Sequence, residues 1–237
     1  MAEFNELWPG GPLFAQAKHF KLGTDCVLLA DFVNAAGAKK GIDLGCASGA
    51  IALLLLAKNE RLNMTGLEID PEAAELADEN MKINSLQDHS SVIGGDIRRH
   101  RELVPCGSFD FAVSNPPYFP LGSGKLSPDR ARAAARGETE CSLCDICRAA
   151  AWLLPTGGSF FMVHKPERLS EVFCTMAGLG IEPKRLRLVC ANAQKAPNLV
   201  LIVGRRGGRP GLKTEPMLIL TESDGSESAE IKRIYHR

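Results

Sequence analysis

The segment from residue 40 to residue 58 constrains the fold of this chain more than any other part of the sequence. Residues 40–44 are typical of a short strand, residues 45–49 are small, and residues 50–58 are strong helix formers. A strand, a turn of small residues and a helix in this order are typical of a βα unit. Small side chains also let a ligand approach the backbone at a helix N-terminus, where free N–H groups point outward. The sequence therefore predicts an α/β fold with a ligand site at this turn.

Polar side chains stand at the ends of four successive strand-like runs. Asp43 belongs to the first run, and Glu68 lies near the end of the second, 23 residues after Gly45. Asp96 follows the third run and Asn115 follows the fourth. Ligands of a doubly wound sheet bind outside the carboxyl ends of its strands, so we expect these side chains to converge on one crevice. A carboxylate at the position of Glu68 is well placed to accept both hydroxyls of a ribose.

Two other interpretations of the turn remain open at this point. A dinucleotide site has the fingerprint G-x-G-x-x-G, but the corresponding residues here are Gly45, Ala47 and Ala50, so only one of three glycines is present. The turn is also compatible with an ordinary packing corner between a strand and a helix. Glu68 would then be a solvated carboxylate without a ligand.

The run Asn115-Pro116-Pro117-Tyr118 comes directly after the apolar residues 109–114. Asn115 and Pro116 each precede a proline, which favours extended backbone, and neither proline has an N–H to donate. The Asn115 side-chain oxygen and the Pro116 carbonyl can each accept one N–H of a planar amine, which draws its nitrogen toward a tetrahedral shape. Tyr118 can stack on a base. The alternative is a proline-rich turn whose aromatic ring fills the core.

With these motifs the chain resembles the class I S-adenosylmethionine-dependent methyltransferases that carry an Asn-Pro-Pro-Tyr motif. It is most similar to the bacterial enzymes that methylate adenine N6 in the anticodon loop of a valine tRNA. The resemblance covers about residues 13–220 and rests on these segments: residues 23–32, Asp43 to Gly49, Gly66 to Asp70, Asn80, Asn115 to Phe119, and residues 207–211. It implies a Rossmann-like α/β fold with a seven-stranded, mostly parallel sheet and helices on both faces. It also implies S-adenosyl-L-methionine as cofactor and tRNA as partner.

The resemblance implies roles for individual residues as well. Those expected at the cofactor are Asp43 and Gly45 at its methionine part, Thr24 and Asp25 at the methionine end, Ala47 and Gly49 in the turn, Glu68 at the ribose and Asp96 at the adenine amine. Those expected at the reacting amine are Asn115, Pro116 and Tyr118. Many relatives have glycine where this chain has Ala47, which adds a methyl group at the tightest point of the turn. No strong general base is required, because the sulfonium is already a good leaving group.

Three other functions share parts of this pattern. The same acceptors would serve glutamine methylation of release factors or guanine-N2 methylation of ribosomal RNA. Against the former, only about forty residues precede the first strand, which leaves little room for a helical substrate domain. A non-catalytic protein that binds S-adenosylmethionine or RNA would not need the intact run from Asn115 to Tyr118, which argues against this function. Ala47 is the one feature that favours it.

Composition indicates a single globular domain. Lys and Arg total 28 and Asp and Glu total 28, and this zero net charge argues against a polycation that binds nucleic acid indiscriminately. We expect one methyltransferase domain over residues 1–220, with a short N-terminal extension, and a polar, poorly ordered tail over residues 221–237. The first residues are acidic and no long apolar span is present, so we expect a cytoplasmic protein without a membrane partner.

Basic residues gather in local clusters and suggest a rim that meets phosphates, the alternative being solvated faces offset by nearby acids. The clusters are Arg98, Arg99 and Arg101; Arg130, Arg132 and Arg136; Lys184, Arg185 and Arg187; Arg205, Arg206 and Arg209, with His164 and Lys165 as weaker candidates. The loop at residues 120–137 is a hypothetical substrate lid.

The cysteine run at Cys141, Cys144 and Cys147 has a spacing that suggests a metal site. On a helix the first and third side chains would point about 120° apart, so the three would not easily share an ion. The apolar spacing of residues 143–153 favours a helix, and no fourth ligand is nearby. We therefore predict structural or free thiols in a reducing compartment and no metal.

Overall fold

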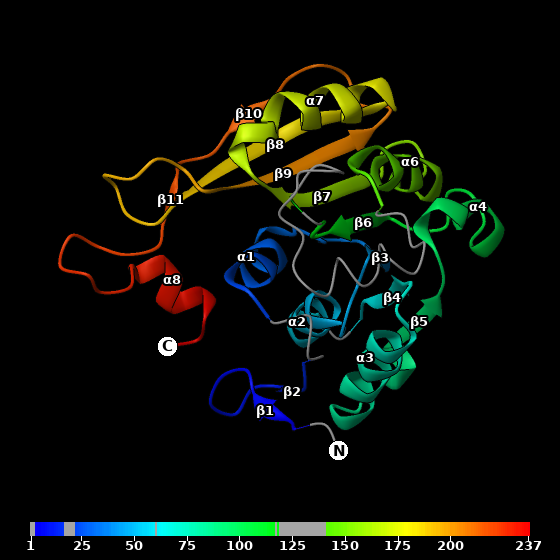
Figure 1. Ribbon diagram of the computed structural model, residues 1–237, viewed down its shortest axis with the longest axis horizontal. Coiled ribbons are helices and arrows are strands. Elements are labelled where there is room, and N and C mark those ends of the chain that lie inside the picture. The colour runs from blue at the N-terminus through cyan, green and yellow to red at the C-terminus, as the bar shows by residue number, and fades with distance from the viewer. Residues whose placement is uncertain (1–2, 17–21, 60, 117, 119–140) are drawn as a thin grey trace, which may run out of the picture.

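A mostly parallel sheet runs through the middle of the molecule, with helices packed on both of its faces (Figure 1). The computed structural model describes residues 3–16, 22–59, 61–116, 118 and 141–237. The predicted lid at residues 120–137 and the cluster Arg130, Arg132 and Arg136 lie outside these residues. None of the helices in the described ranges is long and apolar enough to cross a membrane.

The strand order of the large sheet is β10-β8-β9-β7-β6-β3-β4-β5, with β11 also paired to β8. The strands are β3 (Lys40–Leu44), β4 (Asn63–Glu68), β5 (Ser90–Gly94), β6 (Phe111–Ser114), β7 (Ser159–His164), β8 (Ile181–Cys190), β9 (Leu199–Arg206), β10 (Lys213–Thr214) and β11 (Leu218–Ile219). β9 is antiparallel to both of its neighbours, β7 and β8. The seven predicted strands are present, and the described part of the chain adds the two-residue strands β10 and β11 along β8.

The helices divide between the two faces of the sheet (Figure 1). One face carries α1 (Thr24–Phe32), α2 (Ala50–Lys58) and α8 (Ala229–Ile234), and the other carries α4 (His100–Leu103), α6 (Leu143–Leu153) and α7 (Leu169–Gly178). Alternate residues of each strand feed the two cores: Phe161 packs with α1, whereas Phe160 packs on the opposite side. The predicted Rossmann-like class I methyltransferase fold is therefore confirmed.

Local sequence explains where the helices begin. α3 (Pro71–Ile83) starts at Pro71, and the Asp70 side chain caps it by accepting from the N–H groups of Glu72 and Ala73. α6 starts with a capping box between Ser142 and Asp145, which confirms the helix predicted from apolar spacing. Within the described ranges, short 3₁₀ turns also connect some of these elements: η1 (Gln87–His89), η2 (Ile97–Arg99) and η3 (Pro166–Arg168).

The C-terminal stretch differs from the poorly ordered tail that its polar sequence predicts. Thr221 forms a β-bridge with Glu227, and the Ser228 hydroxyl caps α8 by accepting from the Ile231 N–H. Ile231 and Ile234 are buried against the core that also contains α1. The physical reason is that these two isoleucines, spaced three residues apart, give a short helix one apolar face.

The N-terminal extension forms a small hairpin of its own. β1 (Asn5–Glu6) pairs antiparallel with β2 (Leu13–Phe14), and Phe14 and Ala15 are buried. Trp8, in the turn of this hairpin, stacks on His236 at a centroid distance of 4.1 Å. The two ends of the described chain therefore pack together.

Candidate active site

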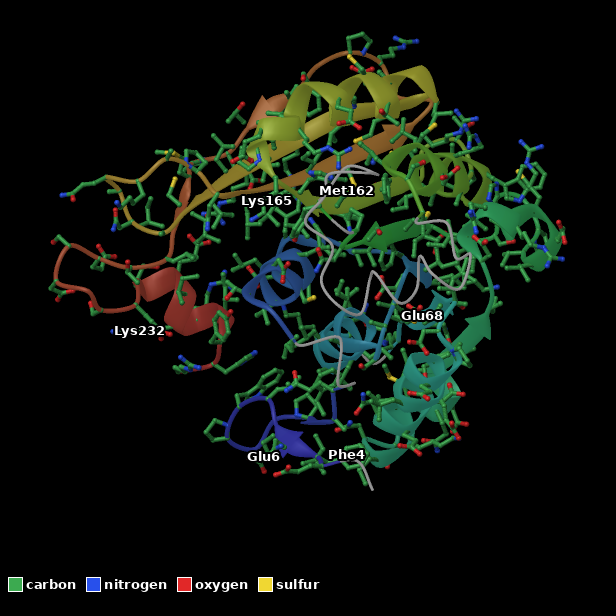
Figure 2. All side chains as sticks on the ribbon, in the orientation of Figure 1. Phe4, Glu6, Glu68, Met162, Lys165 and Lys232 are labelled. Carbon is green, nitrogen blue, oxygen red and sulfur yellow. The ribbon has the colours of Figure 1, made fainter. Side chains whose placement is uncertain are left out.

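The carboxyl ends of the parallel strands bring the predicted side chains to one edge of the sheet. Leu44 lies beside Leu67, and Glu68 lies beside Gly94 in the strand pairing. Asp43 pairs with Val113, two residues before Asn115. Figure 2 shows Glu68 at the end of β4 and Lys165 just after β7, both at this edge.

The turn after β3 is a tight loop with three residues in the left-handed region. Gly45, Ala47 and Gly49 have φ values of 79°, 46° and 79°. The Gly45 N–H donates to the Leu67 carbonyl at 2.9 Å, which ties the turn to β4. Ala47 has a side chain in this left-handed conformation, which carries some backbone strain.

Glu68 holds this turn in place. Its Oε2 accepts from the Ala47 N–H at 2.8 Å, and its Oε1 accepts from the N–H groups of Ile69 and Asp70, each at 2.9 Å. The side chain is buried, with 6% of its surface exposed. These backbone bonds fix the orientation of the carboxylate, and because a carboxylate can accept about four hydrogen bonds, it keeps capacity for hydroxyl donors of a ligand.

Asp43 is the most unusual group at this edge. It is 1% exposed, and neither carboxylate oxygen has a hydrogen-bond partner among the described residues. Burial, and secondarily the negative charge of Glu68, raises the pKa of Asp43 to about 8. A buried acceptor without a donor is costly, so the site is complementary to a cation or an N–H group of a ligand.

Asp96 caps the 3₁₀ turn η2 at the end of β5. Its Oδ1 accepts from the Arg98 backbone N–H at 2.9 Å, and its carboxylate also pairs with the Arg98 guanidinium. The hydrogen bond from the Arg98 guanidinium lowers the pKa of Asp96, despite the opposing effect of burial. A ligand amine at Asp96 would therefore share the carboxylate with Arg98.

The Asn115 side chain belongs to a hydrogen-bond chain that reaches helix α1. The Tyr118 hydroxyl lies 2.6 Å from Asp25 Oδ2 and 2.8 Å from Asn115 Oδ1, and it carries one proton to share between these acceptors. Asn115 Nδ2 donates to the Cys26 sulfur at 3.1 Å. Burial, followed by the hydrogen bond to Asp25, raises the pKa of Tyr118, so the phenol stays a donor. Asp25 thus contacts the Asn-Pro-Pro-Tyr motif, a connection that sequence alone did not reveal.

The other residues of this region take simpler places. Pro116 is buried directly after β6, and Thr24 is the first residue of α1, next to Asp25. Pro117 lies outside the described residues.

Residues at the end of β7 and shortly after it contact Tyr118. His164 lies edge-on to it at a centroid distance of 5.6 Å, and Lys165 Nζ lies 5.1 Å from the ring centre. Arg168 donates to the Tyr118 carbonyl at 3.1 Å. His164 is fully buried, and burial lowers its pKa to about 4, so at neutral pH it is uncharged and is not part of a basic rim.

The predicted basic rim is wrong for the cluster at the end of β9. Arg205 pairs with Ser159, the first residue of β7, so the cluster lies at the edge opposite to the candidate site. The cause is the reversed direction of β9. The Arg206 guanidinium donates to the backbone carbonyls of Ala151, Leu179 and Gly180 and serves the fold.

Other predicted rim residues are also engaged within the fold. Arg187 forms an ion pair with Glu230 on α8, and Arg185 pairs with Glu215. Arg99 pairs with Glu102 one turn along the chain. These contacts favour the alternative of locally offset charges for these arginines. Lys165 lies at the edge of the candidate site, where its Nζ also donates to the Asn198 carbonyl at 3.2 Å.

The three clustered cysteines lie at or near helix α6, where Cys147 is buried and Cys141 and Cys144 are partly buried. Within the ranges that the structure describes, no group of three His, Cys, Asp or Glu residues is placed to hold a metal ion.

Comparison with known proteins identifies the family. The family model described as methyltransferase small domain matches residues 13–176, more than half of the chain. The chain belongs to this methyltransferase family. A curated relative from Tolumonas auensis, named tRNA1(Val) (adenine(37)-N6)-methyltransferase, is 31% identical over 211 residues, which are 89% of this chain and 86% of that protein. A relative of the same name from Porphyromonas gingivalis is 34% identical and covers 76% of this chain and 72% of its own length.

Solved methyltransferase structures share the fold of this family member. A predicted O-methyltransferase from Agrobacterium tumefaciens superposes with a TM-score of 0.72 at 18% identity, covering 90% of this chain and 96% of its own. A Thermus thermophilus protein titled TrmN superposes with a TM-score of 0.51 at 18% identity, covering 76% and 47%. At these identities the likeness concerns the fold alone.

Proposed function

We propose that this methyltransferase transfers the methyl group of S-adenosyl-L-methionine to the exocyclic N6 amine of an adenine in tRNA. The observation that carries the proposal is the position of Asn115, at the carboxyl end of β6 and beside the turn after β3. The names of the relatives, which specify adenine 37 of a valine tRNA, support the same substrate class.

The residues at the sheet edge fit the proposed cofactor. Asp43 offers a buried carboxylate with no hydrogen-bond donor among the described residues, which suits the ammonium group of the methionine part. Glu68 is held in a fixed orientation to accept the ribose hydroxyls, and Gly45 has no side chain to obstruct a close approach. Asp96 lies further along the edge, toward the expected adenine amine. When bound, the cofactor supplies an electrophilic methyl group on a sulfonium.

The amine acceptors lie on the other side of the turn. Asn115 Oδ1 and the Pro116 carbonyl would each accept one N–H of the adenine amine, which aims its lone pair at the methyl group. Because the Tyr118 hydroxyl has one proton, it can donate to Asp25 while Asn115 Oδ1 turns to the substrate. Transfer leaves a surplus proton on N6, and the cationic product amine can release it to water without a general base.

The adenine must leave its stack in the anticodon loop to reach Asn115. Turning a base out costs about a few kcal/mol, and stacking on the Tyr118 ring would offset part of this cost. Lys165 lies next to that ring and Arg168 donates to the Tyr118 backbone carbonyl, and both would help to hold the extruded nucleotide.

Transfer of labelled methyl groups tests the function. The purified protein is incubated with labelled S-adenosylmethionine and total bacterial tRNA, followed by digestion to nucleosides and mass detection. We expect labelled N6-methyladenosine, and an unmodified valine tRNA transcript with guanosine in place of adenosine 37 should receive none. Label in a release factor or in ribosomal RNA guanine, with none in tRNA, would overturn the assignment.

A further inference from the structure

The side chain of Asn80 on α3 is fully buried and makes three hydrogen bonds. Its Oδ1 accepts from the Ala15 N–H, and its Nδ2 donates to the carbonyl oxygens of Ala15 and Ser48, each at 2.8 Å. Both amide hydrogens face carbonyl oxygens, so the side chain has only one acceptable orientation. One amide thus bridges two segments that are 33 residues apart in the sequence.

The first of these segments is the end of the N-terminal extension. Ala15 follows β2, and only eight residues separate it from Thr24, the start of α1. α1 in turn carries Asp25, which contacts the Tyr118 hydroxyl. Ala15 and the helix that contacts the amine-binding residues are therefore close to each other along the chain.

The second segment is the turn proposed to hold the cofactor. Ser48 lies between Ala47 and Gly49, which both have positive φ. The Ser48 carbonyl and the Gly49 N–H belong to the same peptide plane, and that N–H donates to the Cys46 carbonyl at 2.8 Å. By holding the carbonyl, Asn80 fixes the peptide plane and with it the bond that closes the turn.

Helix α3 supports the same turn by packing. A Cβ atom at Gly49 would lie 3.2 Å from Ala77 Cβ and 3.2 Å from Met81 Cε, so the backbone of the turn rests directly on the helix that bears Asn80.

We propose that Asn80 is a positioning residue that holds the cofactor turn in its binding conformation and couples it to the docking of the N-terminal segment at Ala15. The inference rests on the proposed function, because it takes this turn as the cofactor site. If S-adenosylhomocysteine fails to bind the unmodified protein, the cofactor assignment itself fails. If it binds, the measurements below test Asn80 alone.

Asn84, the residue that follows α3 at its C-cap, provides a matched control. Its Oδ1 accepts from the Leu13 N–H at 2.8 Å, and its Nδ2 donates to the carbonyl oxygens of Leu13 and Asn80, each at 2.7 Å. It therefore holds the same extension without a bond to the turn. Replacing either asparagine by aspartate keeps the shape of the side chain. It replaces the donating NH2 group by an oxygen acceptor that faces two carbonyl oxygens.

Titration calorimetry with S-adenosylhomocysteine compares the two variants. We expect Asn80→Asp to raise Kd about tenfold or more and Asn84→Asp to change it by less than about twofold, because only Asn80 donates to the turn, through the Ser48 carbonyl, and the substitution removes that hydrogen bond. In steady-state assays, Asn80→Asp should raise the KM for S-adenosylmethionine while kcat at saturating cofactor stays within about threefold. Equal values of Kd for the two variants would overturn the proposal.

Amide hydrogen exchange in the unmodified protein tests the coupling without any variant. Coupling is reciprocal, so S-adenosylhomocysteine should slow exchange at the Ala15 amide as well as at Gly49. Slower exchange at Gly49 with no change at Ala15 would show that the segment and the turn are independent. This measurement decides the question even where Asn80→Asp does not fold.

Discussion

Asn115 is the residue on which the chemistry of the proposed reaction depends most directly. Replacing it by alanine removes the side-chain acceptor for the amine but leaves Asp43, Glu68 and the turn intact. We expect kcat to fall by at least about a hundredfold, as for loss of other polarising groups. The Kd of S-adenosylhomocysteine, measured by calorimetry, should change by less than about twofold.

Asn63→Ala is a suitable control, because Asn63 is exposed at the start of β4, at the opposite end of the strand from Glu68. Loss of cofactor binding in Asn115→Ala would show that Asn115 belongs to the cofactor site and not to the amine site.

Asp43 should make stability and binding depend on pH. Its pKa is about 8 in the folded protein and about 4 in an unfolded chain, so the folded state holds a proton that the unfolded state releases between these values. The contribution of Asp43 to stability is therefore full below about pH 4 and is lost as the pH rises to about 8. Thermal unfolding without cofactor should show this decline between pH 5 and about 8, and Asp43→Asn should lack it.

Protonation of Asp43 should also weaken binding of the cofactor. An ammonium group beside Asp43 favours the ionised carboxylate, so the affinity for S-adenosylhomocysteine should rise with pH up to about 8 and should do so less in Asp43→Asn. Asp88→Asn, at an exposed position, should follow the unmodified protein. Equal pH dependence in all three proteins would mean that Asp43 does not face the ammonium group.

Tyr118 combines a ring for stacking with a hydroxyl that organises two side chains. Tyr118→Phe keeps the ring and removes the donor to Asp25 and Asn115. We expect a loss of about 1.5–3 kcal/mol of stability, the range for a hydrogen bond to a charged group, and a lower kcat with little change in the KM for tRNA. Chemical denaturation and steady-state kinetics measure these effects, and Tyr235→Phe controls for loss of a phenol elsewhere.

At the scale of elements, helix α8 is the part of the fold whose contribution is least apparent from the sequence. Ile231 is 4% exposed, and Ile231→Ala should lower the free energy of unfolding by about 2–4 kcal/mol. Lys232→Ala, on the exposed side of the same helix, should change it by less than about 0.5 kcal/mol. Denaturant titrations compare the two, and similar values would mean that α8 adds nothing to the core.

Apolar runs explain why the elements around the candidate site were predictable from sequence. The helix at residues 50–58 and the strand ending at Glu68 lie within one residue of the predicted positions, because a mainly apolar segment between polar or small residues leaves few alternatives. β10 and β11 were not predictable, since two residues cannot show a period. The prediction of a poorly ordered tail was wrong for a related reason. Polar residues dominate the composition of the tail, whereas the burial of two isoleucines determines how it packs.

At the scale of the whole molecule, strand direction determines which of the predicted side chains the fold brings together. Parallel strands share a carboxyl edge, so Asp43, Glu68 and Asn115 converge, as the alternation of strands and helices indicated. Arg205 and Arg206, at the end of β9, lie at the opposite edge, because β9 runs in the reverse direction to its neighbours. The local sequence around these two arginines does not indicate the direction of the strand. The Asp25–Tyr118 contact was equally invisible, because it joins residues 93 positions apart.

The two short strands along β8 have a consequence for the behaviour of the protein in solution. β10 pairs with Arg185 and Leu186, and β11 pairs with Val189 and Cys190, so much of the outer edge of this ten-residue strand already has hydrogen-bond partners. A bare edge of this length would be a template on which strands of other molecules could add. Residues 213–219 thus protect the edge of β8 from pairing with other molecules. A variant that lacks them should aggregate even while the arrangement of its active-site residues is preserved.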